Sequence, residues 1–344
     1  MSRRFALLTA LLLLCAVAVD AKSSRKGDAV HRVMTCNIRI TGLPADEKEG
    51  IRWDDRKKTM VECIRKYHPD IIMMQEVIYD SYAYCKKEFS DYFPFGFEGP
   101  EMDKYTEGYH FIGKNVIFFS RDRYEFVSAG CYWLSETPEI GGSISWGTNR
   151  ARHCNWVRIR DKRTGKEMRL LDLHLDHKVQ EAKENQAKVV VREAAQYGDD
   201  FPQILCGDFN SKKHSPQVRH FIDNGWHDAY DDLHDGKEFG YTAHGFKGDN
   251  RPYKPTQGRI DYIMTRGKAK ALSCEVLKDR PKGIYPSDHY FMLAEIEVGK
   301  GRQVEGTITT QKKGWSNNII RPPFLFLISK MQGFEKEGKG VYLT

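Results

Sequence analysis

The stretch Gln203-Ile204-Leu205-Cys206-Gly207-Asp208-Phe209-Asn210-Ser211 decides the fold of this chain. Its first four residues form a mostly apolar run typical of a buried β-strand, and we predict a strand over residues 203–210. The run leads directly into Asp208 and Asn210, residue types that favour turns and also offer oxygen ligands. Taken alone, this end is explained equally well by an Asx-type loop before a helix that starts near residue 215.

The same pattern, an apolar run that leads into polar residues, recurs along the chain. It is found at residues 36–39, 75–77, 172–177, 259–262 and 287–290. Each segment alone has a simpler explanation: Glu76 suits a helix cap, and Asn37 suits a turn. Packed sheets collect such strand ends at one rim, however, so we expect several carboxylates and two histidines to meet there.

Strand-like runs rich in β-branched and aromatic residues extend over most of the sequence. They cover residues 33–40, 71–77, 115–120, 126–134, 153–160, 168–175, 203–210, 259–264, 271–277 and 291–298. Apolar residues at helical spacing predict helices over residues 53–67 and 180–197. Many strands with few helices predict two sheets packed face to face with helices outside. The long segments 91–113, 135–152 and 227–257 are expected to be loops that wall an active site.

The N-terminus has the layout of a secretory signal peptide. Arg3 and Arg4 precede an apolar run over residues 5–19, and a small residue, Ala21, marks a cleavage site. We therefore expect residues 1–21 to be removed and the protein to be secreted or periplasmic. A lipid anchor on Cys15 is the weaker alternative, because the bulky Leu14 precedes it. The run is shorter than the ~20 residues of a membrane span, so we expect no transmembrane span in the mature chain.

Composition separates the body of the chain from its C-terminus. Hydrophobic residues make up 40% and charged residues 29% of the sequence, as in soluble globular proteins. The formal net charge is +7, but residues 299–344 hold eight Lys or Arg and only three Glu. That segment is a basic tail of unknown role, and the body is close to neutral. A near-neutral body slightly favours small phosphate esters over nucleic acid as substrate, and leaves both open.

The residue types at the strand ends suit the hydrolysis of phosphate esters. A phosphate ester is anionic and repels hydroxide, so a hard cation such as Mg²⁺ or Mn²⁺ on carboxylate and amide oxygens is needed to neutralise it. A second carboxylate must orient water or take its proton. A histidine held by a buried aspartate can donate to a phosphoryl oxygen. The cysteines show no zinc spacing, and Cys36 and Cys206 are expected to be packing residues.

The ordered set of motifs resembles the endonuclease/exonuclease/phosphatase superfamily over residues 31–298. The most specific motifs are Gly207-Asp208-Phe209-Asn210 and Ser287-Asp288-His289. The resemblance implies an α/β fold: a four-layer α/β sandwich with two packed, mostly antiparallel sheets flanked by helices and the site at one edge of both sheets. Residues 53–56, 133–138 and 152–156 are similar to a branch of secreted bacterial members.

The resemblance implies a metal site on three residues. Glu76 would be the principal ligand, Asn37 would lie beside it, and Asp288 would complete the metal and water environment. The cation would be Mg²⁺, with Mn²⁺ as the alternative. The chain departs from repair nucleases at Arg39, where they often carry a metal-associated Asp.

The resemblance also implies the catalytic residues. Asp208 would orient or activate the attacking water, and Asn210 would hydrogen-bond the phosphate. His289 would contact the scissile phosphate with the support of Asp261, and His174 matches a second phosphate-contacting histidine.

Arg152 is predicted to bind the substrate, because a guanidinium matches phosphate bidentately; a surface arginine before a strand is an equally good explanation. The predicted function is a metal-dependent phosphatase or phosphodiesterase, nucleases included, acting by water attack on a metal-bound phosphate. The substrate would be a sugar or lipid phosphate or a nucleic acid, and the protein a monomer. The alternative is a non-catalytic secreted binding module on the same fold.

Overall fold

The computed structural model of this protein describes residues 27–98, 113–252 and 258–299. The predicted signal peptide over residues 1–21 lies outside the described residues, as does the predicted tail beyond its first residue, Gly299. Within the described ranges, no helix combines the length and the hydropathy that crossing a membrane requires.

The first sheet has the strand order β11-β12-β1-β2-β4-β3. Its strands are β1 (Val30–Asn37), β2 (Ile71–Val77), β3 (Tyr92–Phe95), β4 (Lys114–Ser120), β11 (Ala269–Leu277) and β12 (Phe291–Val298). The pair β1 and β2 is parallel, and the other neighbours are antiparallel. The parallel pair brings the carboxyl ends of β1 and β2 to the same edge.

The second sheet has the order β5-β6-β7-β8-β10-β9. Its strands are β5 (Tyr124–Trp133), β6 (His153–Asp161), β7 (Glu167–His174), β8 (Gln203–Asp208), β9 (His227–Asp228) and β10 (Asp261–Arg266). Here β7 and β8 form the parallel pair, and the other neighbours are antiparallel. Each sheet therefore contributes one pair of strands whose polar ends lie side by side.

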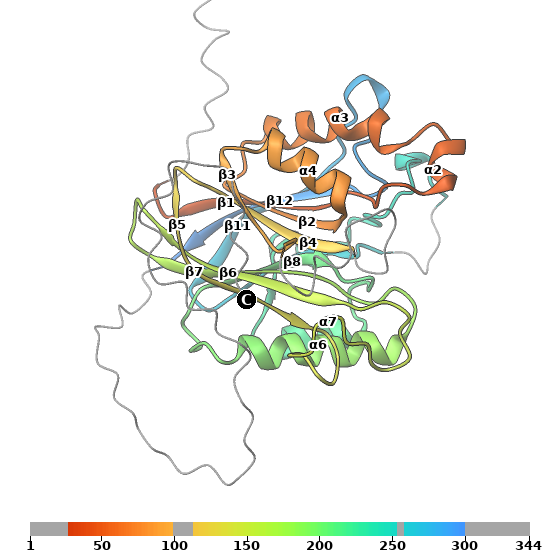
Figure 1. Cartoon of the computed structure of the whole chain (residues 1–344). Helices are drawn as coiled ribbons and strands as arrows, with labels where there is room; N and C mark the ends of the chain where they lie inside the picture. The colour runs from red at the N-terminus through yellow and green to blue at the C-terminus, as the bar shows by residue number, and fades with distance from the viewer. Residues whose placement is uncertain (1–26, 99–112, 253–257, 300–344) are drawn as a thin grey trace, which may run out of the picture.

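Helices cover the outer faces of both sheets, which completes four layers (Figure 1). Helices α3 (Trp53–Lys66) and α4 (Tyr79–Glu88) lie on the first sheet, and α6 (Gln180–Ala194) and α7 (Pro216–Asp223) lie on the second. The short elements are α2 (Pro44–Lys48), α8 (Ala229–Leu233), η1 (Gly248–Asn250) and η2 (Pro281–Gly283). The predicted four-layer α/β sandwich with mostly antiparallel sheets is confirmed.

Alternation along the strands builds the core. In β8, Ile204 and Cys206 pack between the two sheets, whereas Leu205 packs against α6 and α7. In β1, Val33 faces the other sheet and Met34 faces the helices of its own sheet. Because both faces of these strands are buried, their sequence is a continuous apolar run that becomes polar only where the strand ends.

Several predicted boundaries differ from the structure. Strand β1 ends at Asn37 rather than at residue 40, because Arg39 adopts a left-handed φ of 63°. Strand β8 ends at Asp208 rather than at residue 210, because Asn210 has a φ of 47°. Both residues depart from the extended backbone of a regular strand, and the strand pairing ends before each of them, at Asn37 and at Asp208. The predictions that residues 91–113 and 227–257 form loops were wrong at their starts, which are strand β3 in the first segment and β9 followed by α8 in the second. Helix α4 was not predicted.

A buried histidine joins the two sheets far from the strand ends that carry the polar motifs. His31 of β1 is fully buried, and its Nδ1 lies 2.8 Å from the hydroxyl of Tyr124 in β5. Burial, and then the charge of Arg123, lower the pKa of His31 to about 2. The native protein therefore keeps this imidazole neutral at pH values where an unfolded chain would protonate it.

We expect this histidine to make stability fall in mild acid. Below pH 6.5 the unfolded state binds a proton at His31 and the native state does not, so the free energy of unfolding drops by about 1.4 kcal/mol per pH unit as pH falls from 6.5 towards 2. Urea unfolding between pH 6 and 4 tests this with His31→Gln, which cannot titrate. The slope of stability against pH should become shallower by about that amount, and an unchanged slope would contradict the assignment.

Candidate active site

The ends of four strands converge at one edge of the sandwich. Asn37 ends β1, Glu76 lies near the end of β2, His174 ends β7 and Asp208 ends β8. Asp261 begins β10 and pairs in register with Asp208. The two parallel pairs place these side chains in one cluster although they come from different sheets.

The amide of Asn37 connects the two sheets at this edge. Its Nδ2 donates to Glu76 Oε1 at 3.2 Å and to Asp208 Oδ2 at 3.0 Å. The two carboxylates are therefore separated by no more than the sum of these distances. The convergence predicted for Glu76 and Asp208 is what the structure has.

Glu76 is held as a charged carboxylate. Its Oε2 accepts a hydrogen bond of 2.7 Å from the backbone N–H of Ile40, while Asn37 donates to Oε1. Burial would raise its pKa, but the Ile40 hydrogen bond and the nearby charge of His289 lower the pKa below its ordinary value. Glu76 also has a left-handed φ of 65°, a strained conformation for a residue with a Cβ. Such strain is often found where a side chain must be aimed for function.

His289 and Asp261 form a buried charged pair. His289 Nδ1 lies 2.9 Å from Asp261 Oδ2, and His289 Nε2 lies 3.9 Å from Asp208 Oδ2. Burial opposes protonation of the imidazole, but the charges of Asp261 and Asp208 raise the pKa of His289 well above its ordinary value. The hydroxyl oxygen of Thr242 accepts from the backbone N–H of Asp261 and so fixes the start of β10.

The surroundings of Asp208 favour its neutral, protonated form. Burial and then the charge of Asp261 raise the pKa of Asp208 to about 7. Its Oδ1 accepts from the backbone N–H of Asn210 at 2.8 Å, and its Oδ2 accepts from Asn37. A carboxyl group of this pKa exchanges protons near neutral pH, as a general base must.

His174 contacts Asn210 and Asp208. The Asn210 amide donates to Leu175 O at 3.1 Å, which assigns its Nδ2 as a donor, and His174 Nε2 lies 2.9 Å from this nitrogen. Burial and then the charge of Arg152 lower the pKa of His174 well below its ordinary value. A neutral imidazole that accepts through Nε2 carries its proton on Nδ1. The geometry therefore makes His174 a support for Asn210.

Asp288 lies at this edge but is paired with a cation of the chain. Its Oδ2 accepts from Arg39 Nη1 at 3.1 Å, and the same guanidinium donates to both carboxylate oxygens of Asp46. The hydroxyl of Ser287 donates to Asn37 O at 2.6 Å, which ties the segment before β12 to the end of β1. The left-handed φ of Arg39 thus directs its guanidinium towards Asp288. From the sequence, this position was notable only because repair nucleases often carry an Asp there.

Arg152 is buried close to the same carboxylates. It is 7% exposed, its Nε has no hydrogen-bond partner among the described residues, and its Nη2 lies 3.5 Å from His177 Nδ1. Burial lowers the pKa of Arg152, and the charges of Asp176, Glu76 and Asp208 counteract this effect. A buried guanidinium with so few partners is poised to bind an anion.

Two sets of ligands could hold a cation at this edge. Asp208, Asp261 and His289 each offer an atom within 4.8 Å of the others. However, a protonated His289 has no lone pair to give, so this trio suits proton transfer better than metal binding. Glu76 is charged, its oxygens keep free lone pairs, and Asn37 Oδ1 accepts only from the N–H of Arg39 among the described residues. Hard oxygen ligands of this kind fit Mg²⁺ or Mn²⁺.

A pocket of about 340 Å³ opens beside Asn210. It is lined by Gln180, Lys183, Asn210, Ser211, Lys212, Ser215, Gln217, Tyr241, Ala243, Arg251, Gly258 and Ile260. Sequence reasoning missed its cations, although Arg251 lies in the segment 227–257 that was expected to wall the site. Lys183 could also have been found from the sequence, because it lies on the predicted helix outside the buried apolar face and is therefore free to line a pocket.

Comparison with known proteins identifies the family. The model of the Endonuclease/Exonuclease/phosphatase family matches residues 34–289. The chain belongs to this family. The matched residues include five of the six predicted strand-end motifs in full and the sixth as far as His289, and the predicted superfamily is confirmed. The assignment to a secreted bacterial branch stays a prediction.

Relatives in the family differ widely in length and name. Nocturnin of Drosophila melanogaster is 23% identical over 285 residues, which cover 73% of this chain and 43% of the relative. Tyrosyl-DNA phosphodiesterase 2 of Bos taurus is 26% identical over 254 residues, which cover 71% of this chain and 63% of the relative. The chain therefore spans less than two thirds of the length of either protein.

Solved structures of the family match over more of their length. An endonuclease/exonuclease/phosphatase from Bacteroides vulgatus is 26% identical with a TM-score of 0.68. The match covers 78% of this chain and 99% of that protein's chain. A mannosyl-6-phosphatase of Bacteroides thetaiotaomicron is 25% identical with a TM-score of 0.67. The match covers 77% of this chain and 99% of that protein's chain.

Proposed function

We propose that the chain is a divalent-metal-dependent hydrolase of phosphate esters, with Mg²⁺ as its cation or Mn²⁺ in its place. The observation that carries the proposal is the hydrogen bonding of one amide, that of Asn37, to both Glu76 and Asp208. It places a charged carboxylate suited to a metal beside a carboxyl group suited to proton transfer. Family membership and relatives named phosphodiesterase and mannosyl-6-phosphatase support the same chemistry.

We propose Glu76 as the principal metal ligand, with Asn37 beside it. We propose that Asp288 completes the metal and water environment. Its carboxylate also accepts a hydrogen bond from the Arg39 guanidinium, which it holds at the same edge. When bound, a divalent cation would neutralise the oxygens of the phosphate and of the leaving group.

The proton transfers are assigned to Asp208, at the end of β8, and to His289, which lies just before β12. Asp208 orients the attacking water and takes its proton, since its pKa of about 7 suits a base at neutral pH. His289, kept protonated by Asp261, donates to the phosphate as negative charge develops there. Asn210 hydrogen-bonds the phosphate and is held in place by His174. A direct phosphate contact of His174 stays a prediction.

Arg152 is assigned to substrate binding, and its burial allows a specific prediction. We expect Arg152→Met to lower kcat/KM by about 10- to 100-fold, because a charged hydrogen bond to phosphate is lost. Removing a poorly paired buried cation should leave the free energy of unfolding unchanged or raise it by about 1–2 kcal/mol. Steady-state kinetics and urea unfolding of the same preparation check both effects. Full activity in this variant would exclude Arg152 from the substrate site.

The proposed function is tested by hydrolysis of an aryl phosphomonoester and a bis-aryl phosphodiester, each with Mg²⁺ and with a chelator. We expect turnover of at least one substrate that the chelator abolishes. Absence of metal-dependent turnover on both, and on nucleic acid, would favour the alternative, a non-catalytic binding module. None of the six predicted motifs is missing from the described residues, which favours the enzyme.

The proposals on the protein's location, oligomeric state and substrate class rest on the sequence. We propose a secreted or periplasmic monomer, with a lipid anchor as the weaker alternative. The substrate is a sugar or lipid phosphate or a nucleic acid.

A further inference from the structure

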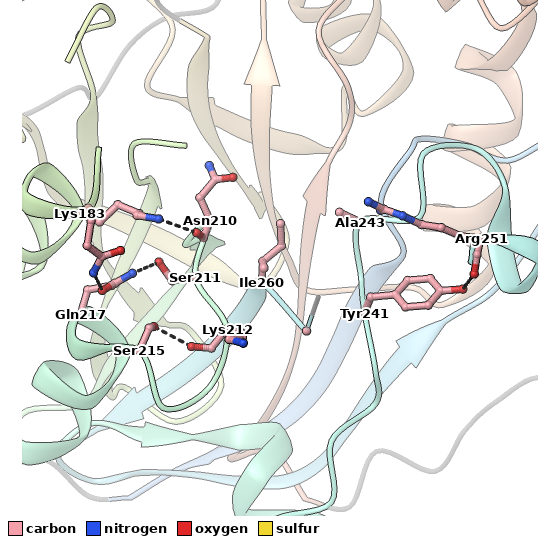
Figure 2. Close-up of a pocket in the computed structure, with 12 residues that line it drawn as sticks. Lys183, Asn210, Ser211, Lys212, Ser215, Gln217, Tyr241, Ala243, Arg251 and Ile260 are labelled. Carbon is pink, nitrogen blue, oxygen red and sulfur yellow. Dashed lines mark hydrogen bonds between the residues drawn. The ribbon is translucent and has the colours of Figure 1, made fainter. Parts of the chain in front are cut away.

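The pocket beside Asn210 carries positive charge from two sides. Lys183 and Lys212 lie with Asn210 on one side, and Arg251 and Tyr241 lie on the other (Figure 2). None of the described residues that line it is acidic. Cations around a cavity repel each other unless an anion enters between them, so the lining favours an anionic ligand.

The pocket adjoins the catalytic centre. Asn210 belongs to both: its side chain meets His174, and its backbone carbonyl accepts from Lys183 Nζ at 3.4 Å. Ala243, also in the lining, forms a β-bridge with His289. A substrate whose phosphate lies against Asn210 and His289 therefore has the pocket next to it.

The two lysines of the pocket are not neutralised by a neighbouring carboxylate of the described residues. In the described part of the chain, no carboxylate forms an ion pair with Lys183 or Lys212. The hydroxyl of Tyr241 donates to Gly248 O at 3.0 Å and to Arg251 O at 3.2 Å, which fixes the backbone that carries Arg251. The Arg251 guanidinium lies over the Tyr241 ring, 5.8 Å from its centroid.

We propose that this pocket binds a second phosphate group of the substrate, so that the preferred substrates are phosphate esters that carry another phosphate near the scissile one. The inference rests on the proposed function for the position of the first phosphate. Two sources share this chemistry: a small bisphosphate, such as a phosphorylated sugar, and the neighbouring phosphate of a nucleic-acid chain.

Matched substrate pairs test the proposal with the full chain and Mg²⁺. The sugar pair is glucose 1,6-bisphosphate against glucose 1-phosphate, and the nucleic-acid pair is 5′-phosphorylated dithymidylate against thymidine 5′-monophosphate. We expect kcat/KM to favour the doubly phosphorylated member of at least one pair by about tenfold. The pair with the larger ratio identifies the source of the second phosphate.

The variant that decides the matter is Lys212→Ala, because the Lys212 side chain is exposed and its ammonium forms no hydrogen bond or ion pair within the described residues. We expect it to reduce that ratio by about five- to tenfold, and Lys212→Glu to reduce it further. Lys188→Ala, an exposed lysine of α6 outside the pocket, removes the same charge and should leave both rates unchanged. A wild-type ratio near one, or a ratio that Lys212→Ala and Lys188→Ala change equally, would overturn the proposal.

Calorimetric titration with the same four compounds separates this inference from the proposed function. If none of them is hydrolysed, the proposed function is in doubt, and the affinities replace the rates under the same criteria. Tighter binding of the doubly phosphorylated compound that weakens in Lys212→Ala would still support the pocket. Equal affinities, or no binding of any of the four, would refute it.

Discussion

Glu76→Gln should lower metal-dependent turnover by at least about three orders of magnitude. The substitution keeps the shape of the side chain and removes the charge of the proposed principal ligand, and a bound cation supplies several kcal/mol of charge stabilisation in phosphate chemistry. Mg²⁺ should also stop raising the melting temperature of the variant, because a ligand stabilises only the fold that binds it. Kinetics and thermal melts over a range of Mg²⁺ concentration measure the two effects.

Two further variants separate loss of metal from loss of fold. Glu275→Gln, on the exposed side of β11, removes the same charge away from the site and should behave like the native protein. Glu76→Gly should be as inactive as Glu76→Gln, although glycine adopts the φ of 65° without strain, because relief of the backbone strain does not replace the lost ligand. Retention of near-normal turnover and of the Mg²⁺-induced melting shift in Glu76→Gln would contradict the metal assignment.

Asp261→Asn should lower kcat by about 10²- to 10⁴-fold, the usual range for general acid–base catalysis. Asp261 Oδ2 lies 2.9 Å from His289 Nδ1, and its charge raises the pKa of that imidazole. Without the charge, His289 loses its proton at a lower pH and can no longer donate to the phosphate. The exposed Asp223→Asn serves as the matched control.

The pH dependence of this variant gives a second measurement. Asp261 raises the pKa of His289 and also that of Asp208. The reaction needs His289 protonated and Asp208 ionised, so the first pKa sets the basic limb of the rate profile and the second sets the acidic limb. Removal of the Asp261 charge lowers both pKa values, and the whole profile should move to lower pH. A profile that keeps its position would show that the pair does not control the reaction.

Part of this site was readable from local patterns. An apolar run that turns polar at its end marks a buried strand, and each of the six motifs could be located this way. The family resemblance then implied a role for each of them, because Asp208, Asn210 and His289 lie within the most specific motifs of the family. The strand boundaries were less accurate, since left-handed residues such as Arg39 and Asn210 end the strands without a distinctive sequence signal.

The protonation states were not readable from the sequence. His174 and His289 are both histidines at strand ends, yet the first is kept neutral and the second charged. The difference comes from neighbours: Arg152 lies near His174, and Asp261 contacts His289. These neighbours come from segments distant in the sequence, so spacing along the chain gives no information about them.

The sequence by itself determined the sheets, the order of the polar strand ends and the residue types available there, because hydrophobic periodicity is a local property. The tertiary structure alone decided which of these residues touch. The Asn37 amide reaches Asp208 across 171 positions, Arg39 reaches Asp288 across 249, and Lys183 and Arg251 face one pocket from different elements. Such contacts depend on how two sheets pack and on how much water that packing removes, and both are set by the whole chain at once.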